Sequence, residues 1–291
     1  MQRISFYDEI AANKRNSIIL IAAVFLLAFV SIYAFSWVFL GGSELGFAIS
    51  LLLASAYIVI TYSFADKIVL SLSGAREAKK EEYPYLVNVV EGLSIAAGIP
   101  APKIYIIDEP AMNAFATGLS PQRASIAFTT GLLSNLNRAE LEGVAAHEIS
   151  HIKNYDMRMA TLAAVMVGLI ALISDFSLRK MFWSRGGGRK GGGIFLIIGV
   201  LIIVLAPFVV HLVRLALSRQ REYLADATAV QLTRYPEGLA SALEKVKKVG
   251  SAVKNVSDAT APLYFANPLS VVQLFSTHPP IDERIKRLRS M

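Results

Sequence analysis

The chain has 291 residues, of which 54% are hydrophobic and 18% are charged. Soluble domains carry about 25% charged residues, so this composition, with a mean hydropathy of +0.50, predicts contact with lipid. The absence of cysteine excludes disulfides, thiolate metal sites and cysteine nucleophiles, so a metal ion would need histidine and carboxylate ligands. The net charge of +7 does not indicate a nucleic-acid partner, because the chain has no binding motif of that class; we expect its basic residues to face the anionic headgroups of a lipid bilayer.

Two uncharged apolar segments in the N-terminal region, 1–64, predict a transmembrane hairpin. Residues 18–40 and 46–64 are each about long enough for a helix to cross a hydrocarbon core of about 30 Å. The first segment is too long for a cleavable signal and lacks a small-residue cleavage pattern after it, so we expect it to remain as an anchor. Lysine and arginine flank the hairpin but are missing from its turn, which predicts that both flanks lie on the cytoplasmic side.

The next region, residues 65–158, is much more polar and is expected to form the first part of a folded domain. A charged helical start at 75–82 leads into an apolar pattern of helical spacing. Gly98 and Pro100 are expected to end this helix, because glycine favours the residue after a helix and proline cannot continue one.

Strand patterns follow this helix. Residues 103–108 alternate between apolar and polar side chains, residues 124–133 form a second strand pattern, and the two segments are expected to pair in a small sheet. Asn137 is suited to cap the N-terminus of a further helix that begins at Arg138.

A second apolar pair occupies residues 159–213. Residues 159–174 are short for a membrane crossing, whereas residues 194–213 are long enough. The basic, glycine-rich loop between them, which includes 186–193, would lie outside if both segments cross, against the positive-inside tendency. We favour two crossings, with a re-entrant or peripheral hairpin as the alternative. Either arrangement returns residues 214–291, the second part of the folded domain, to the side from which the chain left.

The motif His147-Glu148-Ile149-Ser150-His151 carries the clearest chemistry. Histidines four residues apart on a helix lie on one face, so both imidazoles can reach one ion. Glu148 is rotated away from the two histidines and can contact a metal-bound water, from which it would take a proton as general base. Zinc favours this chemistry because it lowers the pKa of bound water to about 7. The alternative is a surface helix with two histidines and a solvated acid.

A third metal ligand is expected from a distant segment. Glu222 follows the second apolar pair, and catalytic zinc sites of the His₂Glu type complete their three protein ligands with a glutamate. Asp226, one helical turn later, is placed to accept a hydrogen bond from the free ring nitrogen of a ligand histidine. The alternative for these acids is a surface face with salt bridges to neighbouring arginines. A membrane hairpin between His151 and Glu222 would bring both motifs to the same side of the bilayer.

Three further residues are candidates for substrate contact. Asn113 and Ala114 lie in the segment 110–118, and an extended polypeptide can bind by pairing with a strand there or at 124–130; the alternative for the segment is a plain loop between two strands. His278 precedes Pro279 and Pro280, and it can donate to the oxyanion of a tetrahedral intermediate or simply form the turn before a terminal helix.

Together, HEISH, the downstream EYLAD, the NAFATG segment and the terminal STHPPIDERIKRL resemble the HtpX family of membrane-bound zinc peptidases over nearly the whole chain. The resemblance implies a zinc endopeptidase of the inner membrane whose active site faces the cytoplasm. It also implies a role in quality control of misfolded or damaged membrane proteins under stress. It matches His278 with a transition-state-stabilising histidine and Asn113 with a substrate-contacting asparagine. The chain has too few spans for the helical cage of the related CaaX prenyl peptidases, which makes a prenylated substrate the weaker alternative.

The sequence therefore predicts a mostly helical α+β protein with a zincin-like metallopeptidase domain and about four transmembrane helices. One Zn²⁺ ion per subunit would be bound by His147, His151 and Glu222, and membrane or unfolded polypeptides would be the substrates. A scaffold whose zinc only ties two helices together is the rival interpretation, and a structural site of that kind would use four protein ligands. The sequence does not indicate an oligomeric state or a regulator.

Overall fold

A computed structural model describes residues 43–165, 219–249, 263–265 and 279–291, and a set of single residues and short runs within 11–37. All the described residues within 11–37 are helical. The apolar segment 194–213, the glycine-rich loop and His278 lie outside the described residues.

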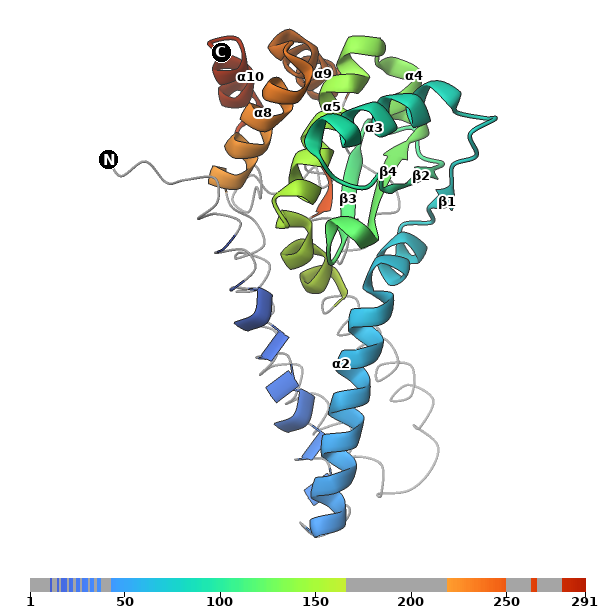
Figure 1. Cartoon of the computed structure of the whole chain (residues 1–291), viewed down its shortest axis with the longest axis vertical. Helices are drawn as coiled ribbons and strands as arrows, with labels where there is room; N and C mark the ends of the chain where they lie inside the picture. The colour runs from blue at the N-terminus through green and yellow to red at the C-terminus, as the bar shows by residue number, and fades with distance from the viewer. Residues whose placement is uncertain are drawn as a thin grey trace, which may run out of the picture.

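The most prominent element is a 29-residue helix, α2 (Glu44–Leu72), which projects away from the rest of the fold (Figure 1). The side chain of Ser43 accepts from the backbone N–H of Gly46 and caps its start. In the part of the chain that the structure describes, α2 is the one helix long and apolar enough to cross a membrane, judged by length and composition. It contains the predicted second span and continues beyond it to Leu72.

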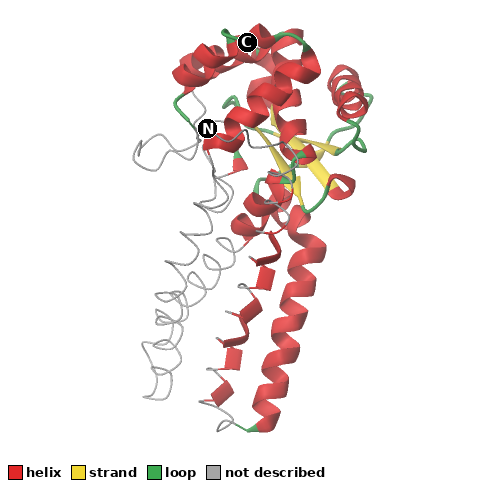
Figure 2. Ribbon diagram, turned by 60° about the vertical axis from the view of Figure 1, so that its left-hand side comes forward, coloured by secondary structure: helices red, strands yellow, loops and turns green. Residues whose placement is uncertain are grey.

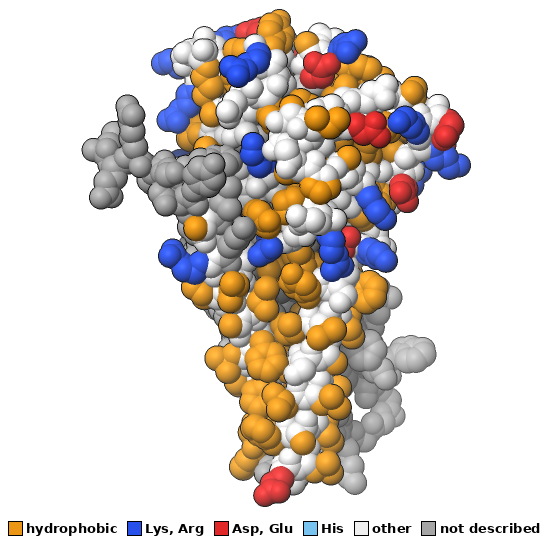
Figure 3. All heavy atoms as spheres, viewed as in Figure 1, with side chains coloured by type: hydrophobic (Ala, Val, Ile, Leu, Met, Phe, Trp, Pro, Cys, Tyr) orange, Lys and Arg blue, Asp and Glu red, His pale blue; other side chains and the backbone are white. Residues whose placement is uncertain are grey.

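Hydrophobic side chains cover the projecting half of the molecule, while lysine, arginine and acidic side chains gather over the opposite half (Figure 3). The helical residues within 11–37 run beside α2 (Figure 2), and Phe29 and Tyr33 each meet the ring of Phe47 edge-on, at centroid distances of 5.4 and 5.6 Å. These ring contacts place the described residues within 11–37 alongside α2.

The sheet has four strands in the order β1-β2-β4-β3. They are β1 (Arg76–Glu77), β2 (Lys103–Ile107), β3 (Ala114–Gly118) and β4 (Ala124–Thr129). The central pair, β2 and β4, is parallel, while β1 and β3 run antiparallel to their neighbours. The predicted pairing of 103–108 with 124–133 is therefore confirmed.

Two strand boundaries differ from the sequence prediction. β4 ends at Thr129, because the Thr129 side chain accepts from the backbone N–H of Leu132 and caps a short helix, α4 (Thr130–Asn135). The predicted helical start at 75–82 is wrong: this stretch holds β1 and a turn, and α3 (Pro84–Ala97) begins only at its proline. The second error arises because β1 forms by pairing with β2, a contact between distant segments that local patterns do not contain.

Helix α5 (Arg138–Lys153) runs through the centre of the domain. It begins with the predicted Asn137 cap, and Glu140 completes a capping box by accepting from the Asn137 backbone. Gly98, with a φ of 70°, ends α3 as predicted.

Helices α3, α8 (Arg219–Thr233) and α9 (Pro236–Val249) pack against α5, and α10 (Ile281–Leu288) packs on α8 and α9. Gly143 of α5 and Gly238 of α9 allow an unusually close approach: a Cβ at Gly143 would lie 2.6 Å from the Leu239 backbone nitrogen. The segments before and after the second apolar pair thus form one folded body.

A second apolar cluster joins this body to α2. The helix that resumes at 156 buries Met159, Leu162 and residues 163–165 against Val69 and Leu70 near the end of α2. The first part of the predicted apolar segment 159–174 therefore packs on the domain, and the remainder lies outside the described residues.

Candidate metal centre

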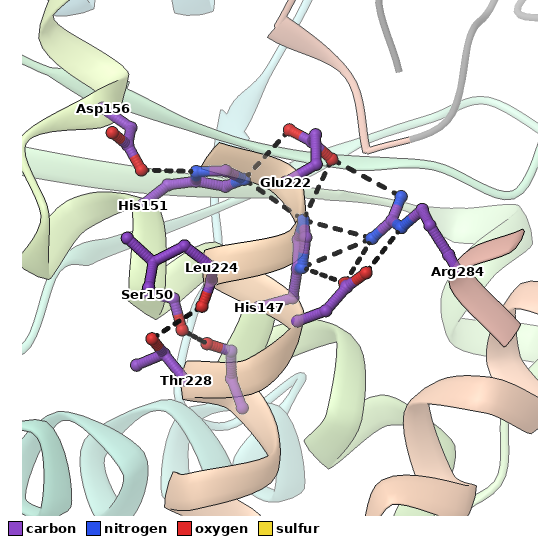
Figure 4. A network of polar contacts seen from close by, with 10 residues as sticks. His147, Ser150, His151, Asp156, Glu222, Leu224, Thr228 and Arg284 are labelled. Carbon is purple, nitrogen blue, oxygen red and sulfur yellow. Dashed lines mark hydrogen bonds and ion pairs between the residues drawn. The ribbon is translucent and has the colours of Figure 1, made fainter. Parts of the chain in front are cut away.

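Helix α5 places both histidines of the HEISH motif on one face. The Nε2 atoms of His147 and His151 lie 3.1 Å apart, one helical turn along α5 (Figure 4). Two nitrogens bound to one tetrahedral zinc ion at about 2.05 Å would be about 3.3 Å apart. His147 and the next residue along the helix, Glu148, are both buried. The pair is therefore arranged to share one ion, as the spacing predicted.

Glu222 reaches the same point from α8. Its carboxylate oxygens lie 3.6 Å from the Nε2 atom of His147 and 3.5 Å from that of His151. Ligand atoms from the three residues lie within 4.8 Å of one another, and among the described residues this is the one such group of His, Asp and Glu. Imidazole and carboxylate form a donor set that suits zinc. The residues present therefore fit the metal that the sequence predicts.

Each histidine has a carboxylate on its other ring nitrogen. Asp226 Oδ1 lies 2.9 Å from His147 Nδ1, which is the contact predicted for this residue. Asp156 Oδ2 lies 3.2 Å from His151 Nδ1. Such contacts fix the tautomer and orientation of a ligand histidine, leaving Nε2 free for the ion. Both sides of the histidine pair are thus held in place.

The sequence analysis missed Asp156. The described backbone turns at Tyr155, whose φ is 61°, and this turn brings Asp156 back toward the helix it has just left. A left-handed conformation at a tyrosine is uncommon and has no local sequence signal. The one signal in the sequence that could have suggested Asp156 is that it is an acid five residues after His151.

Burial and neighbouring charges shift the acid–base behaviour of the motif. Desolvation, with a further contribution from the Glu222 carboxylate, raises the pKa of Glu148 to about 7. Burial lowers the pKa of His147 to about 4. For His151, burial opposes the charged form, but Asp156, Glu222 and Glu148 outweigh it and raise the pKa to about 9. A carboxyl group with a pKa near neutrality can both accept and return a proton.

Arg284 of α10 is the second residue that sequence reasoning missed. Its Nε and Nη2 atoms donate to the two oxygens of Asp226 at 2.9 and 2.7 Å, and Nη1 lies 3.5 Å from Glu222 Oε2 (Figure 4). Burial raises the pKa of Asp226, but the Arg284 charge and the contact with His147 dominate and hold it at about 2. The arginine lies in a charged terminal segment that resembles any amphipathic surface helix.

The edge of the sheet beside the metal centre is β3. Asn113 and Ala114 are both buried, and the Asn113 side-chain oxygen accepts from the Ala114 backbone N–H at 3.1 Å. The Ala114 carbonyl accepts from the backbone N–H of Phe265 at 2.7 Å. Phe265 also meets the His147 ring edge-on, with ring centroids 5.1 Å apart.

The expectation that an extended chain lies along 124–130 is wrong. β4 is paired on both sides, with β2 and with β3, so its backbone has no free edge. Any added strand in this part of the sheet would have to pair with β3 instead. The predicted role of His278 cannot be placed in the site, because that residue lies outside the described ranges.

Comparisons with known proteins match the chain to a peptidase family. Residues 80–291 match the model of Peptidase family M48. A protease HtpX homolog of Dictyoglomus turgidum is 53% identical over 294 residues, covering 100% of this chain and 96% of the relative. A protease HtpX homolog of Thermoanaerobacter pseudethanolicus is 46% identical, covering 100% of this chain and 99% of the relative.

A solved structure shares the fold. The crystal structure of S. mikatae Ste24p aligns with a TM-score of 0.51 at 20% sequence identity, covering 96% of this chain and 66% of that chain. At this identity the likeness concerns the fold alone. The family match and the full-length identities carry the assignment: the chain belongs to peptidase family M48, among the HtpX homologues, and is a metalloprotease.

Proposed function

We propose that the chain is a membrane-bound zinc endopeptidase in which His147, His151 and Glu222 bind the ion and Glu148 is the general base. The observation that carries this proposal is the convergence of three ligand side chains from α5 and α8 around one point. The scaffold interpretation is less well supported, since a structural zinc site fills four positions with protein ligands and only three such residues form the group in the described part of the chain.

A bound zinc ion would polarise the scissile carbonyl and acidify a water molecule. Glu148 is buried beside His147 on α5, the helix that also packs against β3. In this proposal Glu148 removes the proton of the water and delivers it to the leaving amine. Asp226 and Asp156 hold the two histidines, and His278 donates to the developing oxyanion.

We place the substrate as an extended polypeptide along β3. Unpaired strand edges bind extended peptides through backbone hydrogen bonds. β3 is an edge strand and packs against α5, the helix that carries Glu148. A peptide that pairs with the Ala114 carbonyl would take the place of the Phe265 N–H. If the peptide replaces Phe265 in this way, Asn113 and Ala114 would contact the substrate.

The membrane setting of the proposal rests on α2. Its apolar side chains, including Leu52, Val59 and Ile60, are exposed along most of its length, which favours lipid as their environment. We propose about four crossings, formed by residues 1–64 and 159–213, with the site on the cytoplasmic side of the inner membrane. The substrates would be misfolded or damaged membrane proteins, and the activity would belong to quality control under stress. A prenylated substrate remains the weaker candidate.

The test compares wild type with Glu148→Gln, both purified in detergent, by zinc content and by cleavage of an unfolded casein-like substrate. We expect about one zinc per chain in both and a loss of cleavage of about 10²–10⁴-fold in the variant, the usual contribution of a general base. Glu142→Gln is the matched control, because Glu142 lies on the same helix but contacts Arg138 and Tyr85 at the surface. Equal cleavage by wild type and Glu148→Gln would overturn the assignment of the base.

A further inference from the structure

Arg284 is a fully buried cation in contact with the carboxylates around the metal centre. The side chain is 1% exposed, and its guanidinium spans Asp226 and Glu222. Nη2 also lies 3.4 Å from His147 Nδ1 and 3.5 Å from His147 Nε2. The ring of Phe265 covers the guanidinium, with its centroid 5.1 Å from Cζ. One arginine therefore contacts a ligand histidine, a ligand carboxylate and the acid that orients the histidine.

The geometry of α8 explains why a cation is needed here. Glu222 and Asp226 lie one turn apart on the same helix, and both carboxylates point at His147. Glu148 adds a third acid within the same buried region. Like charges at this spacing repel one another, and burial strengthens the repulsion because water no longer screens it. A compensating positive charge therefore stabilises the packing of α8 against α5.

Besides His151, whose pKa these acids raise, two cations can compensate the acids, and both of them act on Glu222. A divalent ion would bind Glu222, and Arg284 already forms a two-bond contact with Asp226 and approaches Glu222 to 3.5 Å. A guanidinium forms such fork-shaped contacts with carboxylates, whereas a lysine ammonium acts as a point charge. The two cations should therefore stabilise the folded site by less than the sum of their separate effects.

We infer that Arg284 is a positioning residue that supplies, until the metal ion binds, the positive charge that keeps the buried carboxylates of Glu222 and Asp226 packed against His147. This inference rests on the proposed metal-binding function. The competing explanation is that Arg284 only anchors α10, whose Ile285 and Leu288 are buried in the domain core. The two explanations differ in how a substitution at Arg284 responds to zinc.

The experiment measures the thermal unfolding midpoint of the full-length chain in detergent, with a chelator and with added Zn²⁺. We expect Arg284→Gln to lower the midpoint of the chelated protein by roughly 10 °C, since it breaks a buried ion pair. We expect it to lower the midpoint of the zinc-loaded protein by less, so that the upward shift caused by Zn²⁺ is larger than in wild type. Arg284→Lys keeps the charge but not the fork, and should give an intermediate zinc shift.

Two substitutions on α10 provide the controls. Leu288→Ala removes buried packing without touching the carboxylates and should lower both midpoints equally. Lys286→Gln removes an exposed cation of the same helix, two residues from Arg284, and should change neither midpoint. If the zinc shift of Arg284→Gln equals or falls below that of wild type, the inference is overturned.

If Arg284→Gln does not fold with or without zinc, Arg284→Lys replaces it in the test. A zinc shift larger than that of wild type then supports the inference, and an equal or smaller shift overturns it. A wild-type chain that shows no zinc shift at all would instead contradict the proposed metal function, so the two failures can be told apart.

Discussion

Asp156 Oδ2 lies 3.2 Å from His151 Nδ1, five residues beyond the histidine along the chain and around a tight turn. This contact orients the imidazole so that Nε2 faces Glu222. We expect Asp156→Asn to weaken zinc binding by about 10–100-fold, the usual effect of removing a carboxylate that supports a ligand histidine. Competition with a chromophoric chelator measures this. Asp108→Asn, an exposed acid near α4, is the control and should leave the affinity unchanged; equal affinities of the Asp156 variant and wild type would show that the contact is dispensable.

The close crossing of α5 and α9 at Gly143 makes a stability prediction. A Cβ there would lie within 3.0 Å of three backbone atoms of Gly238 and Leu239, which cannot move aside as a side chain can. We expect Gly143→Ala to lower the free energy of unfolding by about 1–3 kcal/mol. Gly92→Ala, at an exposed helical position with nothing within 4 Å of the added Cβ, should be neutral or stabilising by up to about 1 kcal/mol. Thermal unfolding of both variants tests the contrast, and equal behaviour would count against this helix crossing.

The raised pKa of Glu148 predicts a pH dependence of the chelated protein. Folding raises this pKa from a usual value of 4.5 to about 7, so the folded chain binds the proton more tightly. The stability that this proton contributes is fully present below about pH 4.5 and is lost as the pH rises through about 7.

Glutamine has no such proton to lose, so the stability of Glu148→Gln relative to wild type should increase across that window. The increase should be roughly 3 kcal/mol. Chemical unfolding of both proteins at several pH values, in the presence of a chelator, measures it. A difference that does not vary with pH would mean that Glu148 is not buried as the structure has it.

The membrane proposal predicts the effect of a charge on α2. Leu52 is 69% exposed within the predicted span 46–64, and a lysine facing lipid costs about 2.5–3.5 kcal/mol at the centre of a span on insertion scales. We expect Leu52→Lys to reduce the fraction of chain that resists alkaline extraction from membranes. Ile95→Lys, at a position 81% exposed on α3 of the catalytic domain, is the matched control and should not change it. If both variants stay equally membrane-bound, α2 is not in contact with lipid at Leu52.

Part of the site was predictable from local spacing and from ligand chemistry. Two histidines four residues apart on a helix must lie on one face, and the need for a third metal ligand pointed to Glu222. The Asn137 cap and the glycine that ends α3 were predictable because both depend only on residues next to the helix end.

Other features depend on contacts between distant segments. Arg284 reaches Asp226 across 58 positions of sequence, and a charged terminal helix gives no sign that one of its arginines is buried. The edge position of β3 follows from the strand order, which places β4 in the interior, and the sequence showed only that two strands would pair. Asp156 depends on a backbone turn at Tyr155 that has no sequence signal.

The central claim is that two segments, 71 residues apart at His151 and Glu222 by their positions in the chain, bind one ion together. The most direct test is the zinc dissociation constant of Glu222→Ala, compared with Gln220→Ala at an exposed position on the same helix. The account predicts that Glu222→Ala weakens binding by at least about 100-fold, since it removes a ligand and not only a supporting group, while Gln220→Ala binds like wild type. Wild-type affinity in both variants would contradict it.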